Sequence, residues 1–268
     1  MSQNFRDRVE ISIENHVAHV EMIREDKLNA LDSDMFDALI EAARWLEKQA
    51  EVRVAVLSGR GRMFCAGLDF MSFAAMAEED PAKALPLEER THGLCNKPQF
   101  AAYAWHELPV PVIAAIRGGA LGGGLQVALG ADIRIAPEDA KIAIAETQCG
   151  LVPDMSGFAL ARRLLRDDVL RQLTYTAQRI DGNRACALGL ITETAQDPLE
   201  RAFEIARQIA ARSPSAIRGS KRLINGLDDQ SSSEILLAES REQGAVIGKP
   251  HQVEAVMANL EKREPVFD

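Results

Sequence analysis

Apolar and polar side chains alternate over residues 9–22, with a polar break at Glu14 and Asn15. Such alternation is typical of strands with one buried face, so the segment predicts a β-hairpin. Residues 32–48 begin with Asp-Ser-Asp, which suits a helix N-terminus, and continue with apolar residues at helical spacing. They predict an amphipathic helix whose buried face carries Met35, Leu39, Ala42 and Leu46.

Short apolar runs then alternate with turns and helical segments. Strands are predicted at residues 52–57, 112–116, 133–135 and 141–145. Strands that alternate with helices predict an α/β layered fold built on crossover units, many of them parallel.

The pattern changes after about residue 156, beyond which most segments have helical periodicity. Several of these segments begin at Asp, Ser or Pro, residues that favour helix starts. The predicted helices cover residues 162–177, 182–189, 198–212, 214–226, 231–248 and 250–262. The chain therefore divides into an α/β part and a helical C-terminal part.

Composition narrows the classes of function. A chain of 268 residues with 47% hydrophobic content can bury a substantial core, and its formal charge of -9 argues against a nucleic-acid-binding surface. The four cysteines and five histidines lack metal-site spacing, which predicts reduced thiols in a cytoplasmic protein and no metal. Arg117 interrupts the longest apolar stretch and the N-terminus lacks a signal-peptide pattern, so we expect a soluble protein with no membrane partner.

Two glycine-containing turns are the most informative segments. Residues 64–69 (FCAGLD) follow a strand and a basic turn and lead into a predicted helix, and residues 117–126 (RGGALGGGLQ) again connect strand to helix. Amides at a helix start point outward unpaired, so such turns can hold a developing oxyanion. Close helix-to-strand packing is the alternative for the glycine run, while a nucleotide loop is excluded because the spacing fits neither common motif.

Together these turns resemble the signature turns of the crotonase superfamily, which includes enoyl-CoA hydratases and isomerases. Three further segments resemble that family in the same order along the chain: KLNAL at residues 27–31, ALGLI at residues 187–191, and EKR at residues 261–263 with Phe267. The resemblance implies a spiral of β-β-α units, with a crotonase core over residues 1–195. It also implies a helical C-terminal region, residues 196–268, that assembles homotrimers or homohexamers.

The resemblance assigns the oxyanion hole to the backbone N–H groups of Leu68 and Gly123. Such amides stabilise the enolate formed when an enoyl thioester gains water or shifts its double bond. It implies an acyl-CoA substrate, with coenzyme A as part of that substrate and no permanently bound cofactor. It assigns coenzyme A binding to Lys27, Leu28, Ala66, Gly67, Asp69, Gly122 and Lys262.

Hydratases of this family use two glutamates, and the corresponding positions here are Gln126 and Glu146. Apolar neighbours could raise the pKa of Glu146 and make it a usable base, although the residue could also be an exposed strand-end glutamate. Gln126 cannot exchange a proton near neutral pH, so the two-carboxylate mechanism is in doubt. Gln126 could still orient water or substrate, or only hydrogen-bond a neighbour.

Asp154 stands eight residues after Glu146, where dienoyl-CoA isomerases and an acyl-CoA dehalogenase of the family place an acidic residue. It could act as acid, base or nucleophile, or cap the helix that begins near Ser156. If Asp154 and Glu146 face one cavity, a proton could be moved between distant carbons. We expect residues 81–94 to form part of the acyl-pocket wall.

The resemblance therefore indicates an enoyl-CoA hydratase/isomerase family enzyme, with double-bond isomerisation favoured slightly over hydration because of Gln126. The alternatives are hydration with a single carboxylate, dienoyl-CoA isomerisation, hydrolysis or dehalogenation through Asp154, and a non-catalytic acyl-CoA-binding protein.

Overall fold

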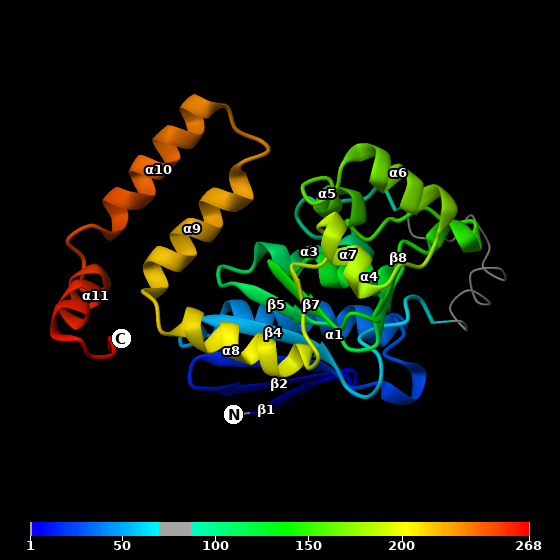
Figure 1. The fold of residues 1–268 in the computed structure, drawn as a ribbon, viewed down its shortest axis with the longest axis horizontal. Helices are drawn as coiled ribbons and strands as arrows, with labels where there is room; N and C mark the ends of the chain where they lie inside the picture. The colour runs from blue at the N-terminus through cyan, green and yellow to red at the C-terminus, as the bar shows by residue number, and fades with distance from the viewer. Residues whose placement is uncertain (1, 70–86, 268) are drawn as a thin grey trace.

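The structure is a computed structural model that describes residues 2–69 and 87–267. Within those residues the strands form a seven-stranded sheet in the order β1-β2-β3-β4-β5-β7-β9 (Figure 1). The strands are β1 (Ser2–Phe5), β2 (Val9–Glu14), β3 (Val17–Met22), β4 (Val54–Gly59), β5 (Val112–Ala115), β7 (Ile133–Ala136) and β9 (Glu193–Thr194). Strands β1 to β3 are antiparallel, and every pairing from β3 to β9 is parallel.

The predicted hairpin is formed by β2 and β3. Glu14 pairs with Val17, so Asn15 and His16 are the whole loop, and both have positive φ angles of 48° and 67°. A two-residue loop of this kind matches the right-handed twist of the strands, and asparagine tolerates the conformation. The prediction at residues 9–22 is confirmed.

Strand β4 is the centre of the sheet, and all six of its residues are buried. Val54 and Val56 face helix α8 (Pro198–Ala210), whereas Ala55 and Leu57 belong to the larger core that includes helix α1 (Ser33–Glu47). A parallel strand covered on both faces is apolar throughout, as this one is.

Helix α1 starts where the sequence predicts, because the Asp32 carboxylate accepts a hydrogen bond from the Met35 N–H. Its predicted apolar face, Met35, Leu39, Ala42 and Leu46, is buried. Helix α3 (Lys97–Glu107) packs beside it, starting at the capping box formed by Asn96 and Gln99. Both helices cover the side of the sheet opposite α8.

A second sheet of two parallel strands, β6 (Gly119–Leu121) and β8 (Lys141–Ala143), lies beyond the carboxyl end of β5. Strand β6 leads directly into helix α4 (Gly123–Leu129), and β8 leads towards the 3-10 helix η2 (Glu146–Cys149). The ends of these two strands place the glycine run beside Glu146.

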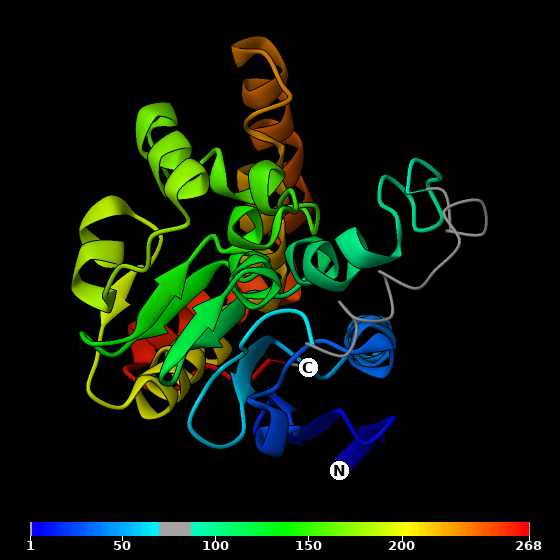
Figure 2. The same cartoon turned by 90° about the vertical axis from the view of Figure 1, so that its right-hand side faces the viewer.

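The remaining helices are α5 (Gly157–Ala161), α6 (Asp167–Thr176), α7 (Gly182–Leu188), α9 (Pro214–Gly226), α10 (Ser232–Val246) and α11 (Pro250–Glu261). Helix α8 packs on the sheet, whereas α10 stands clear of the strands in both views (Figures 1 and 2). Over the described residues, no helix combines the length and the apolar character needed to cross a bilayer.

Two predicted elements differ from the structure. The helix expected at residues 162–177 begins only at Asp167, as α6, because residues 162–166 form a turn that follows α5. The strand expected at residues 141–145 ends at Ala143, because Ala145 turns to a helical conformation and Glu146 begins η2. Glu146 therefore opens a helical turn and does not end a strand.

Candidate functional site

The first turn, residues 64–69, is held by backbone hydrogen bonds on both sides. On one side the Cys65 N–H donates to Gly119 O (3.3 Å), and on the other the Ala66 N–H donates to Leu28 O (3.0 Å). Gly67 has a φ of +95°, which a residue with a Cβ adopts only under strain. The turn is therefore fixed between the segment at residues 27–31 and strand β6.

The Leu68 N–H has no backbone partner in the part of the chain that the structure describes. Leu31 pairs with this segment through the Gly67 carbonyl (2.8 Å) and the Asp69 N–H (3.0 Å). In a parallel bridge of this type the intervening residue turns its own N–H to the opposite side. No acceptor for the Leu68 N–H lies among the residues that the structure describes.

The second turn presents the Gly123 N–H. Gly122, at φ 50° and ψ -123°, precedes α4, and Gly123 is the first helical residue, whose N–H has no partner within the helix. A Cβ built on Gly67 would lie 3.8 Å from the Gly123 nitrogen and 2.8 Å from Leu121 O. The two turns are thus in contact, and small residues are required between them. The packing role predicted for the glycine run is also present, since a Cβ on Gly124 would lie 2.6 Å from Cys65 O.

A cavity of about 510 Å³ opens beside these turns. Ala66, Gly67, Leu68, Gly122 and Gly123 line it together with Gln126, Glu146 and Asp154. Its apolar lining includes Phe36, Leu87, Leu151, Val152 and Met155. One cavity therefore brings together both predicted oxyanion donors and all three polar residues singled out from the sequence.

The carboxyl group of Glu146 lies beside the second turn. A Cβ on Gly122 would lie 3.3 Å from its Oε1. Burial raises the pKa of Glu146, hydrogen bonds from its own backbone N–H and from Gln126 lower it in part, and the nearby Asp154 carboxylate raises it, so that the pKa is raised overall. Its Oε2 is buried and has no hydrogen-bond partner among the described residues. These features favour a carboxyl group that takes up and releases a proton closer to neutral pH than an exposed glutamate does.

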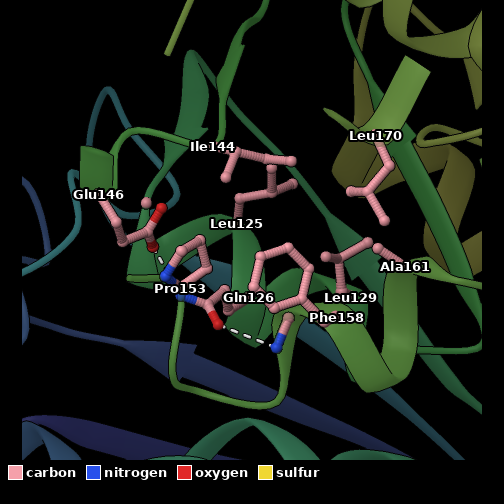
Figure 3. A pocket seen from close by; sticks show the side chains of 11 residues that line it. Leu125, Gln126, Leu129, Ile144, Glu146, Pro153, Phe158, Ala161 and Leu170 are labelled. Atoms are coloured by element: carbon pink, nitrogen blue, oxygen red, sulfur yellow. Dashed lines mark hydrogen bonds between the residues drawn. The ribbon is translucent and has the colours of Figure 1, made fainter. Parts of the chain in front are cut away.

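Gln126 is buried on α4 and uses both ends of its amide (Figure 3). Its Nε2 donates to Glu146 Oε1 (2.6 Å), and its Oε1 accepts from the N–H groups of Met155 (2.8 Å) and Gly157 (2.9 Å). The sequence placed Gln126 at the site, but the two loop amides that orient it had no recognisable signal.

Asp154 borders two cavities. It lines the large cavity and also an adjoining one of about 320 Å³ that includes Arg90, Leu94, Cys95 and Tyr103. Burial raises the pKa of Asp154. The capping alternative is wrong, because Ser156 is the residue preceding α5 and no side chain caps that helix.

The residues predicted to bind coenzyme A are brought only partly together. Lys27 is exposed next to Leu28, whose carbonyl holds Ala66, and Lys27 forms no ion pair with any described residue. Asp69 is buried and forms an ion pair with Arg24 (2.6 Å), so its carboxylate stabilises the first turn from the buried side. Arg60, another candidate cation, is paired with Glu10 and Glu21.

Lys262 lies away from the cavity within one chain. It ends α11, and five residues later the Phe267 carbonyl accepts a hydrogen bond from Arg53 (2.7 Å), which precedes β4. The first turn follows the opposite end of β4, roughly 20 Å away for a strand of this length. The other residues predicted for coenzyme A lie at the carboxyl end of the strand.

The predicted acyl-pocket wall, residues 81–94, falls partly outside the described residues, as does the helix expected to follow Asp69. Of the described part, Leu87 lines the large cavity and Leu94 the adjoining one. Within residues 2–69 and 87–267, no group of three or more His, Cys, Asp or Glu side chains is arranged to hold a metal ion.

Comparison with known proteins assigns nearly the whole chain to one family. The model of the family described as enoyl-CoA hydratase/isomerase matches residues 12–268. Mouse mitochondrial Delta(3,5)-Delta(2,4)-dienoyl-CoA isomerase is 30% identical over 94% of this chain and 79% of its own length. Short-chain-enoyl-CoA hydratase from Clostridium acetobutylicum is 32% identical over 94% of both chains.

Solved structures of enoyl-CoA hydratases resemble this chain over nearly its whole length. Enoyl-CoA hydratase from Bacillus anthracis superposes with a TM-score of 0.85 at 30% identity, covering 97% of this chain and 98% of that one. An enoyl-CoA hydratase from Polaromonas superposes with a TM-score of 0.87 at 28% identity, covering 97% and 99%. The predicted crotonase fold is confirmed, and the predicted trimer stays a prediction.

Proposed function

Because this chain belongs to the enoyl-CoA hydratase/isomerase family, we propose that it moves a double bond within an enoyl- or dienoyl-CoA thioester, with Glu146 as the proton-transferring group. The observation that carries the proposal is the shared cavity. Two carboxyl groups, Glu146 and Asp154, border the same space as the amides of Leu68 and Gly123, which have no acceptor among residues 2–69 and 87–267. The third polar residue, Gln126, is an amide whose hydrogen bonds are already made.

In the proposed reaction the thioester oxygen accepts hydrogen bonds from the Leu68 and Gly123 N–H groups. Glu146 removes a proton from a carbon next to the carbon–carbon double bond, and the electron pair delocalises as an enolate held by the two amides. A proton returned to a carbon further along the chain completes the shift. Donors of this kind each typically contribute about 3 kcal/mol to stabilising the transition state.

Asp154 suits a second proton-transfer role. Burial raises its pKa as it does that of Glu146, so both groups can hold a proton at higher pH than exposed carboxylates. Two such groups along one cavity fit a conjugated dienoyl chain, in which charge spreads over several carbons. The similarity to a protein named as a dienoyl-CoA isomerase supports this choice.

Hydration is the second candidate, supported by the similarity to a short-chain-enoyl-CoA hydratase. Adding water requires that one group activates the water and that a proton reaches the neighbouring carbon. Gln126 cannot exchange a proton, so Glu146 has to serve both steps or share them with Asp154, which lies at the position of neither family glutamate. We therefore place hydration behind isomerisation.

The purified protein should be assayed with 2-enoyl, 3-enoyl and dienoyl thioesters, together with its Glu146→Gln and Asp154→Asn variants. We expect double-bond migration that is faster than hydration, is lost in Glu146→Gln, and is reduced in Asp154→Asn. Fast hydration that survives Glu146→Gln would overturn the assignment of Glu146. Binding of coenzyme A without any turnover would indicate a binding protein, and a covalent adduct on Asp154 would indicate hydrolysis or dehalogenation.

The coenzyme A moiety is proposed to lie along the first turn, near Lys27, Leu28, Ala66, Gly67 and Gly122, with Asp69 holding the turn from within. Lys262 can reach this end only from another copy of the chain. Exposed apolar residues Val253, Val256, Met257 and Leu260 share one face of α11, which suits burial against a second copy. We accordingly propose a homotrimer or homohexamer, located in the cytoplasm as its unpaired cysteines suggest.

A further inference from the structure

The amide of Gln126 has one fixed orientation. Its Oε1 accepts two backbone N–H groups, from Met155 and Gly157, and a flipped amide would place the NH₂ group against both donors. Nε2 must therefore point to Glu146 Oε1, to which it donates over 2.6 Å. Figure 3 shows Gln126 lying between Glu146 and the loop that follows Pro153.

We propose that Gln126 is a positioning residue that fixes both carboxyl groups of the site, Glu146 through its Nε2 and Asp154 through the adjoining Met155 amide. This role rests on the proposed function, in which those two groups transfer the protons. A carboxyl group at position 126 is therefore unnecessary for the chemistry, and a neutral amide is what the geometry requires.

Gln126 supplies the side-chain contact that orients Glu146, in addition to the backbone N–H groups of Ala145 and Glu146. Gln126 is the one side chain that hydrogen-bonds its carboxylate within the described residues. Behind Glu146, the side chains of Leu125, Ile144 and Phe158 line a small cavity of about 10 Å³, and apolar groups cannot orient a carboxylate (Figure 3). Without the Nε2 donor, the carboxyl group could rotate away from the position beside Gly122.

The loop carrying Asp154 depends on the same side chain. Two of its N–H groups converge on one oxygen, which ties residues 155 and 157 to α4. Gly157 permits the approach, because a Cβ there would lie 2.6 Å from Gln126 Oε1. Both carboxyl groups are thus held in position by one side chain, Gln126, on the buried helix α4.

The neutrality of Gln126 also matters. A carboxylate in its place would face Glu146 Oε1 at the same short distance, and two carboxyl groups that close share a single proton. The amide instead stabilises ionised Glu146 through a hydrogen bond and adds no second charge beside it.

The test is a carboxyl ¹³C NMR titration of Glu146 in the free protein, combined with steady-state kinetics. In Gln126→Met, which removes all three hydrogen bonds at similar length, we expect a higher titration midpoint for Glu146. We also expect kcat to fall about 100-fold, as for a misplaced catalytic group, with a smaller change in KM. Gln126→Glu keeps an acceptor for the two loop N–H groups but places a second carboxyl group against Glu146, so it too should raise the midpoint.

Gly157→Ala disturbs the same hydrogen bonds from the loop side, because its Cβ would collide with Gln126 Oε1. It provides a second test if Gln126→Met fails to fold. It should reproduce the higher midpoint and the fall in kcat. Val127→Ala, on the same helix but outside the contact, controls for lost packing and should change neither. An unchanged Glu146 midpoint in both Gln126→Met and Gly157→Ala would overturn the inference. If the wild type isomerises no thioester, the proposed function fails, and the NMR midpoints still decide whether Gln126 positions Glu146.

Discussion

Glu146 combines two opposing influences at the scale of a single residue. Burial and the nearby Asp154 make its charged form costly, while the Gln126 hydrogen bond partly compensates. The net effect raises its pKa, so the charged group opposes folding at neutral pH. Such a cost is typical of functional sites, where a group is held in a protonation state useful for chemistry.

Replacing Glu146 by Gln should therefore stabilise the protein in a pH-dependent way. Below the ordinary glutamate pKa both states are protonated, so wild type and Glu146→Gln should unfold at similar temperatures. As pH rises through that value and then through the raised pKa of the folded state, the wild type should lose stability relative to the variant. Thermal unfolding of both proteins across this range measures the difference.

Exposed Glu14→Gln is the matched control, because it removes a carboxylate at the end of β2, outside the cavity. A difference between wild type and Glu146→Gln that stays constant with pH would contradict the raised pKa. Activity of the wild type should fall on the acid side as Glu146 becomes protonated, and at a higher pH than for an ordinary glutamate.

The segment at residues 27–31 is the element that supports the first turn. Asn29 is fully buried, and its side chain donates to Arg60 O (3.0 Å) and Met63 O (2.8 Å) while accepting from Arg24 N–H (2.9 Å). The element thus contributes to the site by shaping the backbone that carries the Leu68 amide.

Asn29→Ala should lower the free energy of unfolding by roughly 2 to 4 kcal/mol, because two carbonyls and one N–H group in a partly buried region lose their hydrogen-bond partner. Denaturant titration measures the loss, and kcat should fall with it. Asn15→Ala is the control, since Asn15 has a similar positive φ but lies exposed in the hairpin loop. Asn15→Ala should lower the free energy of unfolding by only about 1 kcal/mol, which is the strain of placing alanine at a positive φ. Equal losses in the two variants would show that the buried hydrogen bonds contribute little.

Elements with a strong local signal were predictable from the sequence. The hairpin at residues 9–22 and helix α1 follow from alternation, turn residues and a capping aspartate, all local features. The end of β8 at Ala143 and the start of α6 at Asp167 were not predictable, because tertiary contacts override the local pattern there. Likewise, the sequence indicated Gln126, Glu146 and Asp154, but the amides of Met155 and Gly157 meet Gln126 only through the fold.

The whole molecule leaves its C-terminal helices partly uncovered. Apolar residues on α11 are exposed, and Lys262 lies at the opposite end of β4 from the cavity. Both features are explained if copies of the chain pack together through α11, so that Lys262 of one copy reaches the coenzyme A site of another. Assembly and coenzyme A binding should then be coupled.

Leu260→Asp should reduce the oligomer to smaller species in light scattering and raise KM for acyl-CoA thioesters several-fold. Asn259→Asp adds the same charge to an exposed position off the apolar face and should leave the assembly intact. A wild-type protein that is monomeric in solution, or a Leu260→Asp variant that keeps the wild-type assembly, would contradict the proposed interface.

The most direct test is a crystal structure of the Glu146→Gln variant with a bound enoyl- or dienoyl-CoA thioester. We predict that the thioester oxygen lies about 3 Å from both the Leu68 and Gly123 nitrogens, with the double bond between positions 146 and 154. A thioester oxygen bound elsewhere, or in contact with only one of these amides, would contradict the account.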